Sequence, residues 1–205
     1  MFGFNKKELE IINPLDTPKK VQDFLDKLKI NFEEDGDTCM SPKTVLRKGK
    51  AHCMEGALLA ACILRIHKYK PLIVDLVTTK EDFDHVITVF KQDGYWGSIS
   101  KTNHAVLRYR EPVYKTIREL VMSYFHEYFM DNGKKTLRSY SSPVNLSKFD
   151  KKGWMIDEKD VWYIPEYLCK IPHKKILSRK QLLNLKKAHP VEIKAGKIVE
   201  WKEKQ

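Results

Sequence analysis

The chain has 205 residues and a formal net charge of +11, with 42% hydrophobic and 32% charged residues. This length suits one domain with a proper core, and the composition is typical of a soluble globular protein. The longest apolar run, 57–64, is shorter than the roughly 20 residues that a transmembrane helix needs, and the N-terminal residues lack the pattern of a secretory signal. We therefore expect a cytoplasmic protein that does not span a membrane.

The cysteines indicate thiol chemistry and neither disulfides nor zinc. They are widely spaced and form no C-x-x-C pair. We expect all of them to be reduced. The four positions are Cys39, Cys53, Cys62 and Cys169.

Most of the excess positive charge lies at the C-terminal end. Residues 170–205 contain 11 Lys or Arg and 3 Glu. This change near Pro172 predicts a domain over 1–172, followed over 173–205 by a basic helix and hairpin, either as an appendage or as part of the same domain. A nucleic acid is an alternative partner for these lysines, but no recognised nucleic-acid module is present, so a solvated basic surface is favoured.

Helical signals dominate the first third of the chain. Thr17-Pro18 and Ser41-Pro42 each place a capping residue before a proline, which predicts short helices over 17–28 and 41–49. The stretch 53–66 is apolar on nearly every face, as in a helix buried within a domain. We expect this third helix to form the centre of the core.

The next segment has the pattern of strands. Residues 71–79 are rich in β-branched side chains, and 84–90 alternate between apolar and polar residues. A turn over 92–94 and a resumed extended pattern predict a hairpin over 84–100.

The remaining elements follow from spacing and caps. A long amphipathic helix is predicted over 111–133, closed by Asn132-Gly133. Residues 134–170, which contain Pro143, Gly153 and Pro165, are expected to be mostly irregular with short elements. Ser178 and Gln181 form a capping-box pattern for a helix through 189, and 191–201 has the pattern of a small hairpin.

Cys53 lies where a thiol is most easily activated. The start of a helix stabilises a thiolate through its unpaired N–H groups and its dipole, and so lowers the thiol pKa from about 8.5. A neighbouring imidazole strengthens this effect and can protonate a leaving group. The same N–H groups can stabilise an oxyanion. His85, at the head of a predicted strand, is the candidate imidazole.

Three segments carry a family resemblance: AHCMEGALLAACILR, FDHVITVF and DGYWGSIS. In this order they resemble the transglutaminase-like superfamily of papain-type cysteine enzymes over residues 40–105. The resemblance implies an α+β fold with a cysteine-proteinase-like core, in which the central cysteine-bearing helix packs on an antiparallel sheet. It also implies that Cys53 is the nucleophile and His85 the acid and base.

The third catalytic position departs from this family pattern. The position at which the family has an aspartate falls at or beside Ser100 in this chain, and a serine brings no charge to the imidazole. Ser100 and Asn103 are therefore competing candidates to orient the imidazole. Further candidates for substrate-binding or supporting roles are His52, Glu55, Asp84, Trp96 and His104.

Each of these assignments has a structural alternative. Cys62, inside the apolar helix, is expected to be a core residue. Trp96 either covers the catalytic region or fills the core. The His, Cys, Asp and Glu residues around Cys53 match no zinc spacing, and no phosphate-binding loop is present, so we expect neither a metal nor a cofactor.

The sequence thus predicts thiol-dependent acyl transfer, or amide or peptide hydrolysis, through a Cys53 thioester. A peptide or amide is the expected substrate. Two alternatives remain: a catalytically impaired transglutaminase-like protein that serves as a protein-binding module, and a basic nucleic-acid-binding protein.

Overall fold

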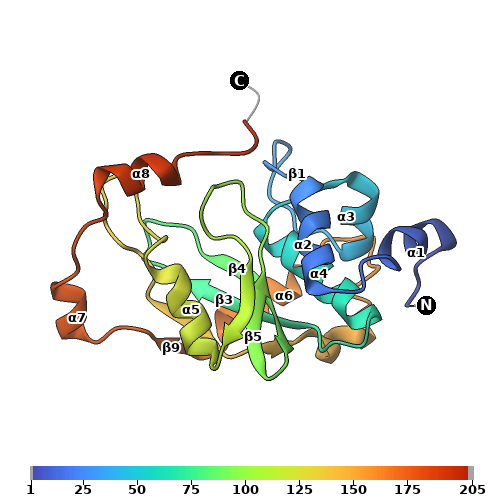
Figure 1. The fold of residues 1–205 in the computed structure, drawn as a ribbon. Helices are drawn as coiled ribbons and strands as arrows, with labels where there is room; N and C mark the ends of the chain where they lie inside the picture. Colours follow the sequence, from blue (N-terminus) through green and yellow to red (C-terminus); the bar gives the residue numbers. More distant parts are fainter. Residues whose placement is uncertain (1, 203–205) are drawn as a thin grey trace.

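A computed structural model describes residues 2–202 and has an α+β architecture (Figure 1). Its main sheet is antiparallel and has seven strands in the order β6-β5-β4-β3-β7-β9, with β8 also paired to β3. The strands are β3 (Leu72–Val77), β4 (His85–Gln92), β5 (Tyr95–Ile99), β6 (Arg110–Tyr114), β7 (Ser139–Ser141), β8 (Val144–Asn145) and β9 (His173–Lys175).

The helices lie mainly before β3 and after β6. A separate two-stranded parallel ladder joins β1 (Lys29–Ile30) to β2 (Lys50–Ala51), directly before the central helix. The helices are α1 (Lys6–Ile12), α2 (Pro18–Lys27), α3 (Pro42–Lys48), α4 (Cys53–Ile66), α5 (Ile117–Phe125), the 3-10 helix η1 (Leu146–Lys152), α6 (Tyr163–Lys170), α7 (Arg179–Leu183) and α8 (Pro190–Gly196). None of the helices within residues 2–202 is long and apolar enough to cross a membrane.

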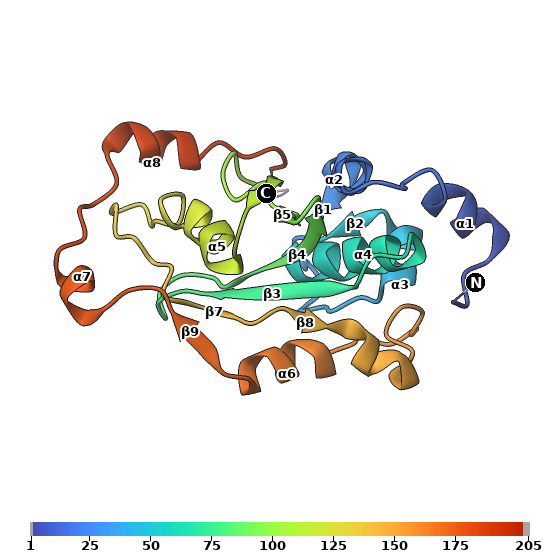
Figure 2. The same ribbon diagram turned by 60° about the horizontal axis from the view of Figure 1, so that its bottom comes forward.

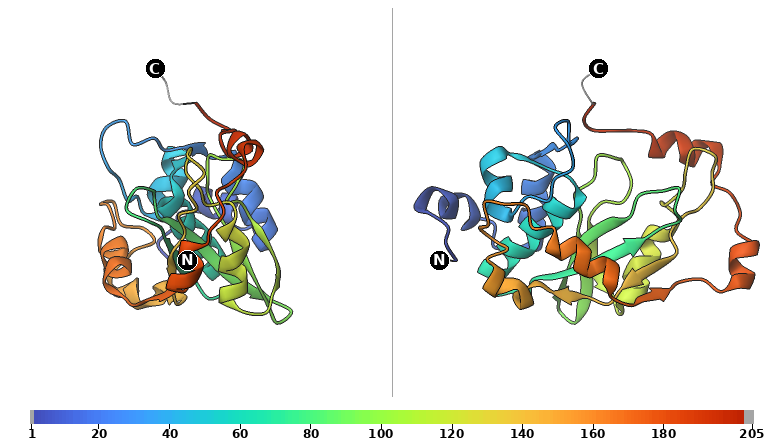
Figure 3. Two further views of the ribbon diagram at one scale, coloured as in Figure 1. Left: turned by 90° about the vertical axis from the view of Figure 1, so that its left-hand side faces the viewer. Right: turned by 180° about the vertical axis from the view of Figure 1, so that it is seen from behind.

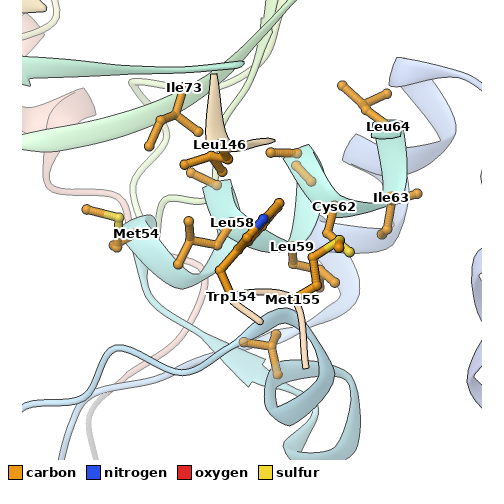
Figure 4. Close-up of a cluster of buried hydrophobic side chains, with 14 of the residues drawn as sticks. Met54, Leu58, Leu59, Cys62, Ile63, Leu64, Ile73, Leu146, Trp154 and Met155 are labelled. Carbon is orange, nitrogen blue, oxygen red and sulfur yellow. The ribbon is translucent and has the colours of Figure 1, made fainter. Parts of the chain in front are cut away.

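Helix α4 is the centre of the larger hydrophobic core, as its composition predicts. Nearly all of its residues are buried. Figure 4 shows side chains along the helix, among them Leu58 and Cys62, together with Trp154 and Met155 from the later part of the chain. The hydroxyl of Thr88 on β4 donates a 2.6 Å hydrogen bond to the Ala57 carbonyl, which ties the helix to the sheet.

A smaller core lies on the other face of the sheet. Alternation along β4 divides its side chains: Val86 and Phe90 join the α4 core, whereas Ile87 and Val89 join a second cluster with α5. In Figure 1, α2, α3 and α4 lie to the right of the strands and α5 to the left; Figure 2 gives a second view of the same arrangement. The sheet is therefore covered on both faces.

The long helix predicted over 111–133 is wrong at both ends. The segment begins as strand β6, Arg110–Tyr114, which extends the sheet beside β5. The helix starts only at Thr116, whose side chain accepts a hydrogen bond from the Glu119 N–H, and it ends at Phe125. Pairing with a neighbouring strand therefore overrides the helical spacing of the first residues.

The C-terminal hairpin predicted over 191–201 is wrong, because helix α8 occupies Pro190–Gly196. His189 caps α8, Pro190 occupies its first position, and the Glu192 carboxylate accepts a hydrogen bond from the His189 N–H. This capping box outweighs the weak alternation of the segment. The helix expected over 178–189 is also shorter, because α7 ends at Leu183.

The basic C-terminal segment is integrated with the rest of the chain. Strand β9 pairs with β7 at the edge of the main sheet. From there the chain continues through α7 and α8 along one end of the molecule, as seen from behind in Figure 3. It then returns toward β5, where His104 and Val199 form an isolated bridge.

Candidate active site

Cys53 is the first residue of α4 and lines a cavity of about 390 Å³. The cysteine is half-buried and His85, on the same cavity wall, is buried. Other wall residues come from segments far apart in the sequence, within 101–107, 127–131 and 193–197. The fold therefore brings the two principal candidates of the sequence together at one accessible hollow.

His85 is held by Ser100. The Nε2 of His85 lies 2.7 Å from the Ser100 Oγ. The register of the β4-β5 hairpin explains this contact: Thr88 is opposite Ile99, so Ser100 lies one position further along, diagonal to His85 on the same face. Of the two competing orienting residues, Ser100 is therefore the one that contacts the imidazole.

The Ser100 hydroxyl fixes which proton His85 carries. The Ser100 Oγ also lies 2.5 Å from the Leu107 carbonyl oxygen, which can only accept a hydrogen bond. The single hydroxyl proton is thus donated to Leu107, and the Ser100 oxygen accepts the Nε2–H of His85. This assignment leaves Nδ1 as the ring nitrogen available to the thiol.

The thiol of Cys53 is acidic for a cysteine. Burial by itself raises its pKa, but hydrogen bonds to His52 and His85 and the charges of both imidazoles lower it from 9.0 to about 5. Cys39 and Cys62 behave in the opposite way, because burial raises the pKa of each thiol well above the ordinary value. Cys53 is therefore the activated cysteine among the three, whereas Cys62 is a core residue as expected.

His52, the residue before Cys53, is a second imidazole at the thiol. Its Nε2 lies 2.9 Å from the Thr38 carbonyl oxygen and its Nδ1 3.3 Å from the Met54 nitrogen. Burial lowers the pKa of His52, but the hydrogen bond to Cys53 and the charges of Glu55 and Cys53 outweigh it and raise the pKa to about 9. Between about pH 5 and about pH 9, the thiolate and His52 therefore form an ion pair.

Glu55 is buried, and its carboxylate accepts hydrogen bonds from several parts of the chain. One carboxylate oxygen accepts hydrogen bonds from the Thr38 hydroxyl at 2.8 Å and the Met40 N–H at 3.0 Å. The other accepts from the Asn31 amide at 3.1 Å and the His52 N–H at 3.0 Å. Glu55 thereby fastens the 31–40 segment, and with it the Thr38 carbonyl, to the start of α4.

The backbone on both sides of Ser100 is held by residues that the sequence analysis did not single out. The buried amide of Gln22 accepts from the Ser100 N–H and donates to the Ser100 carbonyl, both at 2.9 Å. Lys101 is also buried, and its amine donates to the carbonyls of Leu25 and Leu28 at the end of α2. A polar Gln22 on the apolar face of α2 was the only signal available in the sequence.

Leu107 is held in an unusual backbone conformation. Its φ of 61° lies in the left-handed region, which is disfavoured for a leucine. Its N–H donates a 2.7 Å hydrogen bond to the carboxylate of Glu127, which in turn pairs with Arg110 at 2.6 Å. These contacts hold the carbonyl that receives the Ser100 proton, so Glu127 is a further residue that supports the His85 orientation.

The remaining predicted site residues have other contacts. Asp84 lines the cavity and accepts a 2.7 Å hydrogen bond from the Thr78 N–H. Asn103 and His104 also line it, but the Asn103 amide bonds the Trp201 backbone and His104 Nδ1 lies 3.1 Å from the Gly196 carbonyl oxygen. Trp96 does not line the cavity and packs against the second hydrophobic cluster, which includes residues of α5.

Within residues 2–202, no group of three or more His, Cys, Asp or Glu side chains is arranged to hold a metal ion. The polar atoms around Cys53 are instead engaged in the hydrogen bonds described above.

The fold and the site together describe an α+β protein with an activated cysteine at the start of its central helix. No protein-family model matches the chain. No curated protein matches its sequence either. The resemblance to the transglutaminase-like superfamily therefore rests on the three segments and their order.

Proposed function

We propose that this protein is a cysteine-dependent acyl-transfer enzyme with a transglutaminase-like core, acting on a peptide or amide carbonyl. One observation carries the proposal: the Cys53 thiol lies between two imidazoles at a helix start, faces a cavity and has a pKa of about 5. A merely structural cysteine has no need of these features, which are those of a catalytic nucleophile.

The first half of the reaction forms a thioester. The Cys53 thiolate attacks the carbonyl carbon, so that an S–C bond forms and the carbonyl becomes an oxyanion. The N–H of Cys53 is a first-turn donor of α4 and lies closest in the chain to the sulfur, which suits it to stabilise this oxyanion. The C–N bond then breaks, and the departing amine takes a proton from the His85 imidazolium.

The second half regenerates the thiolate. Water, or a second amine, gives a proton to His85 and attacks the thioester carbon. The C–S bond breaks, which leaves the thiolate and the imidazolium as they began. While Cys53 is a thiolate, His52 supplies a positive charge beside it, because the hydrogen bond to Cys53 and the charges of Glu55 and Cys53 raise the pKa of His52 to about 9.

Acyl-enzyme formation is the direct test. In a Cys169→Ser background, which removes the exposed cysteine, the protein is mixed with 4-nitrophenyl acetate and its intact mass is followed. We expect one acetyl group on Cys53, formed with release of nitrophenol, lost by hydrolysis in the buffer and lost faster when glycinamide is added as a second nucleophile. Cys53→Ala should abolish the adduct, and His85→Ala should slow its turnover. An unlabelled Cys53, with no release of nitrophenol above that of the Cys53→Ala variant, would overturn the proposal.

The uncharged side chain of Ser100, which contacts His85, favours a second candidate function. Because Ser100 brings no charge to the imidazole, the protein could be a catalytically impaired relative that binds a protein or peptide in the same cavity. This candidate predicts that Cys53 forms the acetyl adduct and keeps it, with no faster turnover than in His85→Ala. Turnover that depends on His85 selects the enzyme.

A further inference from the structure

The cavity beside Cys53 offers its apolar groups to a ligand. Half-buried and exposed apolar side chains from five segments line it: Ile30, Phe83, Leu107, Phe129, Met130 and Ile193. Phe83 is 88% exposed and stands two residues before His85. A single exposed phenylalanine is ordinary on a protein surface, but one that joins an apolar hollow next to a reactive thiol indicates a binding surface.

Two carboxylates of the same wall form hydrogen bonds within the protein. Asp82 accepts hydrogen bonds from the Phe83 N–H and the Thr136 hydroxyl, and Asp84 accepts from the Thr78 N–H. Such carboxylates serve to hold the loop that carries Phe83. They also disfavour an anionic ligand by their charge.

Other charged side chains of the cavity wall also have partners within the protein. Glu127 holds the Leu107 N–H and pairs with Arg110, while the Lys101 amine is bound to backbone carbonyls. At the rim, Asp131 and Lys197 pair with each other at 2.9 Å. A charged ligand would have to compete with these internal partners, whereas an apolar ligand would not.

Helix α8 supplies part of the apolar wall. Ile193 lines the cavity, and Gly196 packs so closely that a Cβ atom there would lie 3.1 Å from the Phe129 ring. The His104 ring bonds the Gly196 carbonyl and fixes the end of the helix over the site. The basic C-terminal segment thus contributes to the pocket through its apolar face.

We infer that the acyl substrate of Cys53 carries a large uncharged apolar group, such as an aromatic or branched aliphatic side chain, which binds in this cavity. The inference rests on the proposed function, because it names the group that accompanies the reacting carbonyl. Burial of such a side chain strengthens binding by about tenfold or more.

Three chloroacetamides test this preference in the Cys169→Ser protein: the N-benzyl, N-carboxymethyl and N-(2-aminoethyl) compounds. In each reaction the thiolate forms an S–C bond and chloride leaves. Rates are measured at Cys53 and divided by the rate with iodoacetamide. We expect the benzyl compound to react about tenfold faster than either charged compound. Equal normalised rates, or a faster charged compound, would overturn the inference.

Variants locate the preference in the cavity. Phe83→Ala and Ile193→Ala should each reduce the normalised benzyl rate about threefold or more. Leu183→Ala is the matched control, because Leu183 is 79% exposed on α7 and outside the cavity wall. A benzyl rate insensitive to both cavity variants would contradict the inference.

The iodoacetamide reaction separates the two proposals. If Cys53 reacts with iodoacetamide at low pH without a benzyl preference, the apolar substrate is wrong and the activated nucleophile stands. If Cys53 reacts only at the pH of an ordinary thiol, the proposed function fails, and the substrate inference fails with it.

Discussion

The imidazole Nε2 of His85 lies 2.7 Å from the hydroxyl oxygen of Ser100, in the place where the family resemblance leads one to expect an acid. A hydroxyl can orient a ring but cannot stabilise its positive charge. Here the hydroxyl proton is donated onward to the Leu107 carbonyl, so that the ring is held without a carboxylate. The thiolate instead has a second cationic neighbour in His52, next to it in the chain.

The pH dependence of Cys53 alkylation should reveal the activated thiol. Its pKa of about 5, against an ordinary 9.0, means that the thiolate fraction rises as the pH rises through 5 and is nearly complete at pH 7. The measurement is the iodoacetamide rate between pH 4 and pH 9 in the Cys169→Ser protein. His52→Ala and His85→Ala should each shift the midpoint upward, since each removes a hydrogen bond to the thiolate and a positive charge. A midpoint close to that of a free cysteine would contradict the assigned geometry.

Ser100→Ala should slow acylation of Cys53 without unfolding the protein. The loss of the Nε2 partner frees the ring to rotate, and we expect a rate decrease of about tenfold, a fraction of what proton transfer by a positioned group contributes. Ser100→Asp should not restore the rate, because its carboxylate would face the Leu107 carbonyl oxygen.

Ser98→Ala is the matched control for Ser100→Ala. Ser98 is also buried on β5, but its hydroxyl bonds the Tyr124 hydroxyl at 2.7 Å and not His85. Both substitutions remove one buried hydroxyl and should cost about 1 kcal/mol of unfolding free energy. Equal loss of acylation rate in both variants would show that Ser100 has no positioning role.

Glu55→Gln should destabilise the fold. Each carboxylate oxygen accepts two hydrogen bonds. The amide nitrogen of glutamine cannot accept them, so at either position it would lie opposite two donors. We expect the free energy of unfolding to fall by about 2 kcal/mol or more. Urea denaturation measures this loss, and Glu10→Gln on the exposed side of α1 should change stability by less than about 0.5 kcal/mol. Equal stabilities of the two variants would show that the hydrogen bonds of Glu55 do not stabilise the fold.

Gly56→Ala should also destabilise, although alanine favours helices by about 1 kcal/mol over glycine. A Cβ atom at residue 56 would lie 2.4 Å from the Lys101 Cβ, so α4 and the segment that follows β5 would have to move apart. Overpacking of this kind costs about 1–3 kcal/mol. The thermal midpoint should fall, and so should Cys53 acylation, because Lys101 follows Ser100 directly. A midpoint at or above that of the unsubstituted protein would show that the contact relaxes easily.

Local interactions explain which elements the sequence predicted correctly. Thr17 and Ser41 each accept a hydrogen bond from an N–H three residues later, so a few neighbouring residues determine where α2 and α3 begin. The apolar composition of α4 likewise corresponds directly to its burial. A capping box alone also marks α8, but its apolar spacing was equally compatible with a hairpin.

By itself, then, the sequence determined an α+β chain with a cysteine at the head of a buried helix and a histidine at the head of a strand, because caps and periodicity act over a few residues. Only the tertiary structure decided the third partner of the site. Ser100 contacts His85 through strand register, Gln22 holds the Ser100 backbone from 78 residues away, and α8 closes the cavity from the other end of the chain. Contacts across such separations depend on how the elements pack, and no local pattern of residues encodes them.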